Sequence, residues 1–296
     1  MVKSASAYEK TLYTNVTLDT ALDLNLYIPV DATISSVQAN GEELLDTTKL
    51  QTIGEKEYYI ITISDAPKNA HKNVEILITT TSGRVYKLAH SLVNYAETLF
   101  AINESKVTNK AYLADSKDMM LYVLNYAKEV ITKYGDASAD LTKINALLDG
   151  FALTDADKTL ENVKENLPTL TGVSGAFDLD SKVGFALGIA NTFTGKVTVT
   201  VGDTTVNGEY TGDATANGDI VDALVIPNIL AYQLYAMDIT ITVVGENAGT
   251  AVNTTFTYNL ATYVSSGVSG NVGTALYAYA KAAKTYGAKY KVGTID

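Results

Sequence analysis

The 296-residue sequence contains no cysteine and no tryptophan, and its only histidines are His71 and His90. Without cysteine the chain has no disulfide bond, no thiol nucleophile and no cysteine-ligated zinc or iron–sulfur site. The absence of tryptophan also weakens the case for sugar binding, because large aromatic rings are the side chains that stack on sugars. These absences exclude several classes of enzyme and metalloprotein before any motif is considered.

Positive charge is scarce as well. The sequence has 22 lysines and arginines against 33 aspartates and glutamates, a net charge of −11, and no lysine or arginine between residues 197 and 280. Nucleic acid is therefore not expected as a partner, because binding to phosphates needs clustered basic side chains. The most apolar segment, 223–237, contains Pro227 and is too short to cross a bilayer, so no membrane insertion by this chain is expected.

What the sequence has is the composition of a folded protein, with 47% hydrophobic and 19% charged residues. Such a composition is that of a globular chain, and the length favours two domains. The first residues, Met1–Ala5, contain no apolar run of the kind a signal peptide needs. Two interpretations stay open, a cytoplasmic protein and a segment of a secreted precursor whose leader has been removed.

A hydrophobic pattern with a period of two residues occurs twice, 161 residues apart. Apolar residues alternate with others over Leu22–Ile28, and the same alternation recurs over Val183–Ile189. Each pattern predicts a half-buried strand. Two further alternating segments follow in the same order, Val74–Ile78 in the first half and Ile239–Val243 in the second. A shared order of elements predicts a tandem duplication.

Each half of the sequence closes with a tyrosine-containing segment and a helix. We match Tyr86–Ala89 with Tyr258–Ala261 as strands, and we predict helices over about 117–135 and about 270–288. Both predicted helices end in Tyr-Gly, and a glycine at that place can adopt the left-handed conformation that terminates a helix.

These observations predict a mainly β, α+β protein of two tandem immunoglobulin-like β-sandwich modules, each followed by a C-terminal α-helix. The predicted boundaries are module 1 at 1–150 with its helix at about 117–135, a helical connector at 151–168, and module 2 at 169–296 with its helix at about 270–288. Thr154 is expected to cap the connector helix, which places Leu160, Val163 and Leu167 on one face and ends at Pro168. We expect this connector to be stiffer than a glycine- and serine-rich linker.

No group of residues forms a catalytic or cofactor-binding motif. His71 and His90 are predicted to lie at the surface, because no serine-nucleophile motif accompanies them. Asp213–Asp219 resembles a calcium loop, but Leu224 stands where the loop needs a bidentate glutamate, so we predict a glycine-containing hairpin turn. Enzymes that cleave carbohydrates use two carboxylates at a set distance, and with so many carboxylates in this sequence some pair could lie at that distance. A carbohydrate-cleaving enzyme therefore stays open as an alternative. We predict no catalytic, cofactor-binding or metal-binding residues, and we name no ligand-binding residue.

The 20 tyrosines are the one abundant group with binding chemistry, because exposed tyrosine can stack on sugar rings and form hydroxyl hydrogen bonds. Most of them lie at positions that repeat between the two halves or on one face of a predicted helix. Tyr86, Tyr134, Tyr258 and Tyr286 are examples, and we predict that these side chains belong to the core.

Three segments together resemble a known but uncharacterised module. They are the strand Ala21–Ile28, the strand Tyr86–Ala89 and the helix from Leu124 to Tyr134. The arrangement is similar to a duplicated β-sandwich-plus-helix module of large secreted or cell-surface proteins of gut Clostridia (Firmicutes). In that group the helix typically reads Leu-Leu-Asn-Tyr-Gly-Ala, and here Ala127 replaces the glycine. The resemblance implies an extracellular or cell-surface, non-catalytic context and assigns no functional residue.

The sequence as a whole leads to an expected function without an enzyme activity or a cofactor. We expect a tandem module protein that serves as an adhesion, spacer or scaffold segment at the surface of a Gram-positive bacterium. The alternative is a pair of carbohydrate-binding modules attached to a glycan-degrading or mucin-binding surface protein. The partner is expected to be a host or dietary glycan or another surface protein.

Overall fold

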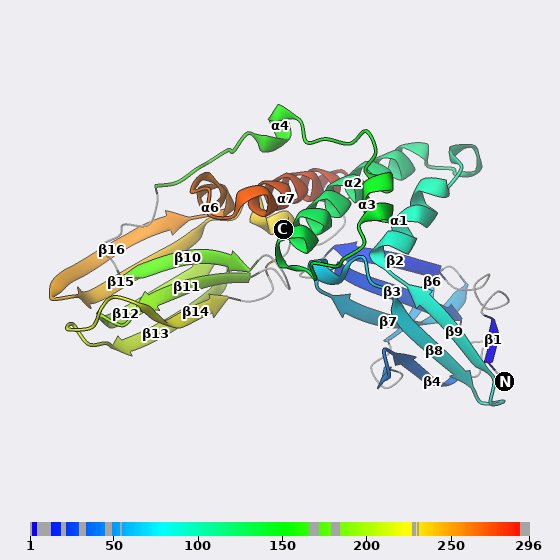
Figure 1. Cartoon of the computed structure of the whole chain (residues 1–296), viewed down its shortest axis with the longest axis horizontal. Coiled ribbons are helices and arrows are strands. Elements are labelled where there is room, and N and C mark those ends of the chain that lie inside the picture. The colour runs from blue at the N-terminus through cyan, green and yellow to red at the C-terminus, as the bar shows by residue number, and fades with distance from the viewer. Residues whose placement is uncertain are drawn as a thin grey trace. The chain divides into compact units, whose positions relative to one another are not determined.

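The computed structural model describes residues 2–4, 13–18, 22–29, 34–44, 49–53, 55–165, 172–178, 184–226, 229 and 231–290. The chain divides into two compact units, Met1–Asp149 and Gly150–Asp296. Each unit is of mixed α+β type, with two small, mainly antiparallel sheets and several helices, the longest of which follows the sheets (Figure 1). The predicted positions Ala21, Val183, Leu167, Pro168 and Pro227 lie outside the described residues.

Unit 1 contains a four-stranded and a five-stranded sheet. The four-stranded sheet has the order β2 (Tyr13–Leu18), β3 (Leu22–Pro29), β7 (Lys56–Asp65) and β6 (Lys49–Ile53). The five-stranded sheet has the order β1 (Val2–Ser4), β9 (Val85–His90), β8 (Val74–Thr80), β4 (Ile34–Ala39) and β5 (Glu42–Glu43). The pair β1–β9 is parallel, and every other pair in the two sheets is antiparallel.

One hydrophobic cluster joins the two sheets of unit 1. Its buried members come from both sheets and include Leu26, Ile28, Val37, Ile61, Ile76 and Ile78. In each strand they occupy alternate positions, because successive side chains of a strand point to opposite faces. The alternation at Leu22–Ile28 therefore predicted a buried face correctly for Leu24, Leu26 and Ile28.

The helices of unit 1 follow its last strand. They are α1 (Leu92–Ala101), α2 (Lys110–Tyr134) and α3 (Thr142–Leu147), with single 3-10 turns at Pro67–Asn69 and Glu104–Lys106. The side chain of Asn109 caps α2 by accepting the Tyr112 N–H at 3.0 Å. Because of this cap, α2 begins seven residues before position 117, where apolar periodicity alone had placed its start.

Unit 2 is built in the same way. Its three-stranded sheet has the order β10 (Val173–Asp178), β11 (Gly184–Ala190) and β14 (Ile220–Ile226). Its four-stranded sheet has the order β13 (Thr204–Thr211), β12 (Phe193–Val201), β15 (Ile239–Asn247) and β16 (Thr250–Tyr258). The helices are α4 (Asp155–Lys158), α5 (Ala231–Leu234), α6 (Leu260–Ser265) and α7 (Gly270–Tyr290).

An aromatic cluster joins the two sheets of unit 2. The ring of Tyr258, at the end of β16, stacks on Phe177 of β10 with centroids 6.3 Å apart and approaches Phe185 of β11 at 5.7 Å. Burial among these rings raises the pKa of Tyr258 above its ordinary range. Tyr258 is thus a core residue, as the sequence predicts.

The two units share the order of their strands. The order β2-β3-β7 in unit 1 corresponds to β10-β11-β14 in unit 2, and β9-β8-β4-β5 corresponds to β16-β15-β12-β13. The alternating segments Val74–Ile78 and Ile239–Val243 are the equivalent strands β8 and β15, and their apolar positions are buried. Unit 1 differs by two additional edge strands, β1 beside β9 and β6 beside β7.

The match of Tyr86–Ala89 with Tyr258–Ala261 as strands is wrong. Tyr258 ends β16, and the next residue, Asn259, caps α6 by accepting the Thr262 N–H at 2.9 Å. Its counterpart in unit 1 is Ser91, whose hydroxyl caps α1 in the same way. A good N-cap residue after the last strand starts a helix despite the strand-like sequence.

The two Tyr-Gly pairs do not end helices by a left-handed glycine. Gly135 follows α2 with an extended backbone, φ −79° and ψ −176°, and a side chain on it would clash with the carbonyl oxygen of Ile131. Gly287 lies inside α7, which continues to Tyr290. The first glycine is required for space, and the second is an ordinary helical residue.

The prediction of core tyrosines holds for only part of the set. Tyr258 is buried, whereas Tyr86 and Tyr286 are half-buried and Tyr134 is 40% exposed. Tyr134 is the last residue of α2, beyond the last buried residue of this helix, Ile131. The fully buried aromatic positions of the two long helices are instead Tyr126 and Tyr277.

Two glycines allow the backbones of β12 and β15 to come close together. Gly195 and Gly245 lie opposite each other, and a side chain on Gly245 would collide with the carbonyl oxygen of Thr194. We expect Gly245→Ala to destabilise the chain by about 1–3 kcal/mol, because the two strands would have to separate. Thermal unfolding followed by circular dichroism measures this change.

The matched control is Gly202→Asn. Gly202 lies in a turn with φ +52° and has open space around it, and asparagine tolerates that conformation. We expect little change in the melting temperature for this variant. Equal stability of the Gly245→Ala chain and the wild type would refute the close approach of the two strands.

Candidate functional site

The two histidines, predicted to lie at the surface, are only partly exposed. His71 and His90 are both half-buried. Burial lowers the pKa of His90, and its Nε2 has no hydrogen-bond partner among the described residues. His90 is the last residue of β9, directly before the capping residue of α1, so its position follows from the strand-to-helix junction.

The loop Asp213–Asp219 uses its polar groups to close a turn. The Asp213 carboxylate accepts hydrogen bonds from the hydroxyl and the N–H of Thr215 at 2.7 and 2.8 Å, and these bonds lower its pKa. The Gly218 N–H donates to the Asn191 side chain at 3.0 Å. The loop joins β13 to β14, which belong to different sheets, so the predicted hairpin is wrong. Among the described residues no three His, Asp or Glu side chains gather where they could hold a metal ion.

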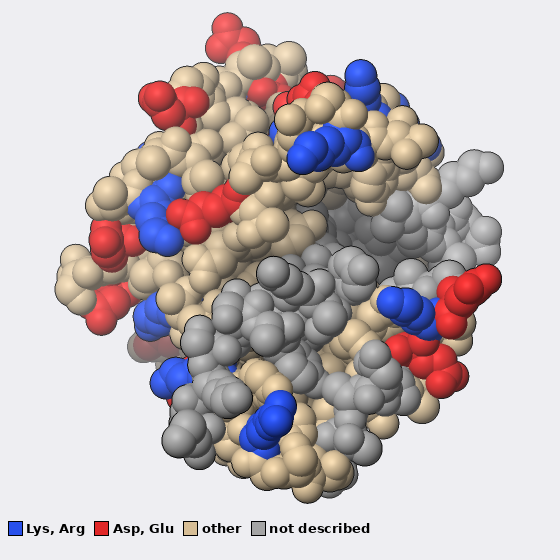
Figure 2. Space-filling model, turned by 90° about the vertical axis from the view of Figure 1, so that its right-hand side faces the viewer, with Lys and Arg blue, Asp and Glu red and all other residues tan. Residues whose placement is uncertain are grey.

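The visible charged side chains of one face form no patch of a single sign (Figure 2). Lysines and acidic residues are interspersed over the described part of the face in Figure 2. Two ion pairs of unit 1 join different elements. Lys87 of β9 pairs with Glu75 of β8, and Lys143 of α3 pairs with Glu97 of α1 at 3.2 Å. Exposed pairs of this kind contribute about 0–1 kcal/mol each to stability.

The most extensive polar site in the described structure is formed by the connector and the helices of unit 2. The connector contains only one helical turn, α4, which begins with a reciprocal capping box between Thr154 and Asp157. Leu160 and Val163 follow this turn outside any helix, so the predicted helical face is wrong. Asn162 has φ +58°, a left-handed conformation that no continuing helix allows.

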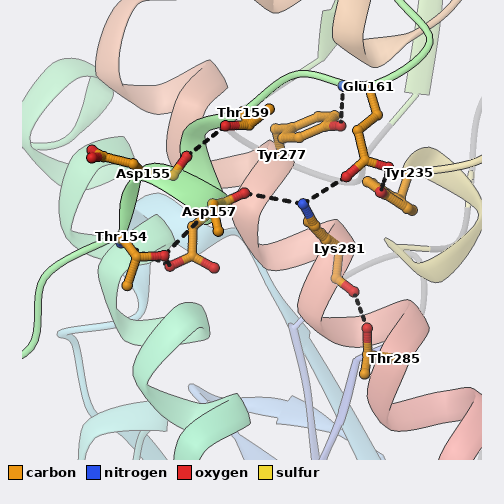
Figure 3. Close-up of polar contacts among 10 residues, drawn as sticks. Thr154, Asp155, Asp157, Thr159, Glu161, Tyr235, Tyr277, Lys281 and Thr285 are labelled. Carbon is orange, nitrogen blue, oxygen red and sulfur yellow. Dashed lines mark hydrogen bonds and ion pairs between the residues drawn. The ribbon is translucent and has the colours of Figure 1, made fainter.

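Glu161 is the centre of the site, and we call Glu161, Tyr235, Tyr277 and Lys281 the connector clamp (Figure 3). One oxygen of the Glu161 carboxylate accepts the hydroxyl of Tyr235 at 2.6 Å, and the other accepts the ammonium of Lys281 at 3.0 Å. The backbone N–H of Glu161 donates to the hydroxyl of Tyr277 at 2.9 Å. Lys281 also donates to the carbonyl oxygen of Ala156 at 3.0 Å. The clamp therefore binds the connector to α7 and to Tyr235, the residue directly after α5.

A second set of bonds holds the end of the connector against α6. The Lys164 N–H donates to the hydroxyl of Thr262 at 2.8 Å, and its ammonium pairs with Asp238 at 3.0 Å. The capping residue Asn259 donates from its amide to the carbonyl oxygen of Asn162 at 2.9 Å. Thr262 and Asn259 are both buried, so these bonds also satisfy polar groups that water does not reach.

Glu161 and Tyr235 keep their protonation states at neutral pH. The hydrogen bonds from Tyr235 and Lys281 lower the pKa of Glu161 below its ordinary value. Burial, followed by the bond to Glu161, raises the pKa of the Tyr235 hydroxyl. Glu161 thus remains an anion, and the Tyr235 hydroxyl keeps the proton that it donates to Glu161 in their hydrogen bond. The arrangement is suited to holding two segments together, and neither group is poised to transfer a proton near pH 7.

Sequence reasoning missed the clamp because its members are far apart in the chain. Glu161 and Lys281 are separated by 120 residues, and no local pattern connects them. One signal was available in the predicted repeat. The second copy reads Leu276–Tyr279 where the first copy has its own helix motif, and this departure contains the clamp residue Tyr277.

No model of a protein family matches the sequence, and no curated protein sequence matches it. None of the described helices is both long enough and apolar enough to span a membrane.

The clamp predicts a pH-dependent contribution of Glu161 to stability. Because its pKa is lowered in the folded state, the stabilisation is present above the ordinary pKa of glutamate and is lost as the pH falls through the lowered value. We expect Glu161→Gln to lower the melting temperature at pH 7, and the difference from wild type to shrink below about pH 4. Calorimetry across this pH range measures it.

Glu165→Gln is the matched control, since it removes the same charge from an exposed position on the same segment. It should leave the melting temperature nearly unchanged at every pH. A Glu161→Gln chain that behaves like this control at pH 7 would show that the clamp does not stabilise the protein.

Tyr277→Phe tests the backbone contact of the clamp separately. The substitution removes the hydroxyl that accepts the Glu161 N–H and leaves the buried ring in place. We expect a loss of about 0.5–1.5 kcal/mol in unfolding free energy, the usual net value of one hydrogen bond. Urea denaturation provides the measurement, and an unchanged free energy would argue against the contact.

Proposed function

We propose that the chain consists of two tandem immunoglobulin-like β-sandwich modules, each closed by a C-terminal helical layer, and that it serves as a non-catalytic adhesion, spacer or scaffold segment. The shared strand order of the two units supports a duplicated module. The resemblance to modules of clostridial surface proteins supports an extracellular or cell-surface location. Repeated sandwich modules are a common way to build extended surface proteins.

The observation that carries the proposal is the connector clamp. A spacer has to transmit tension from module to module without a long floppy link. Residues 150–165 belong to unit 2, and Glu161 and Lys164 bind them to its helices. The segment after the last helix of unit 1 is therefore bound as part of unit 2.

The alternative, a carbohydrate-binding module pair, receives less support from the tyrosines. The two most exposed described tyrosines are Tyr112 and Tyr134, near opposite ends of α2. At about 1.5 Å rise per residue they are roughly 33 Å apart, too far to stack on one or two sugar rings. The partner favoured here is another surface protein.

Force measurements on single molecules test the spacer role. When the chain is pulled from its two ends, we expect two separate unfolding events, because the units of 149 and 147 residues each have their own core. Each event should release roughly 500 Å of extended chain at about 3.5 Å per residue. Extension without resistance, or a single unfolding event for the whole chain, would contradict the proposal that two separate modules resist tension.

Location and ligand class need a separate test. We expect an antibody raised against the chain to label intact cells of the source organism, and a glycan array spanning host and plant polysaccharides to give no signal. Labelling that appears only after the cells are made permeable would overturn the surface assignment. Specific retention by a glycan would replace the structural role with the carbohydrate-binding alternative.

A further inference from the structure

Among the described residues, the edge strand β16 of unit 2 has no second neighbouring strand, whereas its counterpart in unit 1 is covered. β16 forms one end of the order β13-β12-β15-β16, and among the described residues it pairs with β15 alone (Figure 1). The equivalent strand β9 pairs with β8 on one side and with β1 on the other. This edge of the module therefore accepts an additional strand where one is present.

The composition of β16 differs from that of a protected edge. Edge strands usually avoid further pairing by being short, by carrying lysine or proline, or by a bulge. The covered strand β9 has six residues, including Lys87. β16 has nine residues with no charge, no proline and no glycine, and its pairing with β15 is regular over its whole length. The sequence of β16, the longer of the two strands, thus lacks the features that usually prevent an edge strand from pairing further.

The backbone groups that face outward from β16 follow from its turn. A two-residue turn at Ala248 and Gly249 places Asn247 opposite Thr250, and in such hairpins this pair is hydrogen-bonded. Because bonded and non-bonded pairs alternate, the N–H and C=O groups of Asn253 and Thr255 point away from β15.

The N–H and C=O groups of Ala251 and Thr257 also point away from β15, because these residues alternate with the hydrogen-bonded ones in the same way as Asn253 and Thr255. In unit 1, β1 lies beside Val85–Lys87. The matching strand registers make these residues the equivalents of Asn253–Thr255. The outward groups of β16 are therefore the ones that a further strand would use.

We propose that β16 pairs with β16 of a second copy of this chain, in antiparallel orientation about Thr254, and joins two four-stranded sheets into one continuous sheet. In this register Asn253 lies opposite Thr255, and Ala251 lies opposite Thr257. All of these side chains are uncharged, so two copies of a chain with net charge −11 can approach here without like charges in contact.

A second copy is the occupant that gains new hydrogen bonds. In the part of the chain that the structure describes, no strand has to leave β16 before two copies pair, whereas a β1 strand donated from another molecule would first have to leave its own β9. The resulting contact is two-fold symmetric and closed, the commonest form of homodimer. It goes beyond the proposed structural role, since dimerisation is measured independently of location or ligand.

Sedimentation equilibrium of the full chain tests the proposal. We expect a monomer–dimer equilibrium between about 1 µM and about 1 mM, with Thr255→Pro weakening dimerisation at least about tenfold. Proline removes the outward N–H of Thr255 and leaves the bonds to β15 intact. Circular dichroism checks that the variant is folded, and Thr255→Lys provides a second way of blocking the edge if it is not.

The matched control is Thr205→Pro on β13, the opposite edge of the same sheet. By the same alternation, counted from the two-residue turn between β12 and β13, the N–H of Thr205 points away from β12. The hydroxyl of Thr205 lies 3.1 Å from that of Thr200, just as the hydroxyl of Thr255 lies 2.9 Å from that of Thr242. We expect this variant to dimerise like the wild type. A chain that is monomeric at every concentration, or one whose dimer responds equally to both substitutions, overturns the proposal.

Cross-linking tests the register, because the chain has no cysteine of its own. In the proposed dimer the two Thr254 residues form a non-hydrogen-bonded pair with Cα atoms about 4.5 Å apart, within reach of a disulfide. Thr254→Cys should give a covalent dimer on mild oxidation, and Val206→Cys on β13 should not. A dimer cross-linked equally by both would point to a different surface and refute the β16 contact.

Discussion

The bonds that hold the connector against the helices of unit 2 are the constraint on which the rest of the account depends. Backbone groups of an extended segment need partners when they lie against a protein surface. Here side chains provide them, Tyr277 for the N–H of Glu161 and Thr262 for the N–H of Lys164. The connector consequently needs no secondary structure beyond one turn, and it belongs to unit 2 rather than linking two modules as a free tether.

The two units differ in the contacts of the segment that precedes their first sheet. In unit 1, residues before β2 form β1 and cover the edge of β9. In unit 2, the corresponding segment is held on α6 and α7 by the clamp. The segment that precedes the first sheet is therefore placed differently in the two units. Differences between the copies are concentrated at sheet edges, whereas the buried strands keep their order.

Much of the sheet structure was predictable from local pattern. Ile76 and Ile241 lie in strands whose alternating apolar residues are buried, and a period of two residues is a direct consequence of strand geometry. The long helices were also predictable from their periodicity, although the cap at Asn109 placed the start of α2 earlier. These features depend on residues that are neighbours in sequence.

Features that depend on distant contacts were not predictable. The clamp joins Glu161 to residues more than 70 positions away, and the left-handed Asn162 interrupts a segment with helical pattern. Asn259 starts a helix in a stretch that reads as a strand, and Gly135 is needed because Ile131 lies close to it. In each case a single polar contact or a close approach outweighs the local preference of the chain.

Amide hydrogen exchange followed by NMR on the full chain tests the central claim most directly. If the connector is part of unit 2, the N–H groups of Glu161 and Lys164 exchange at least about 100-fold more slowly than in an unstructured peptide, because they open only when the clamp opens. Exchange of both groups at the rate of a free peptide would contradict the account.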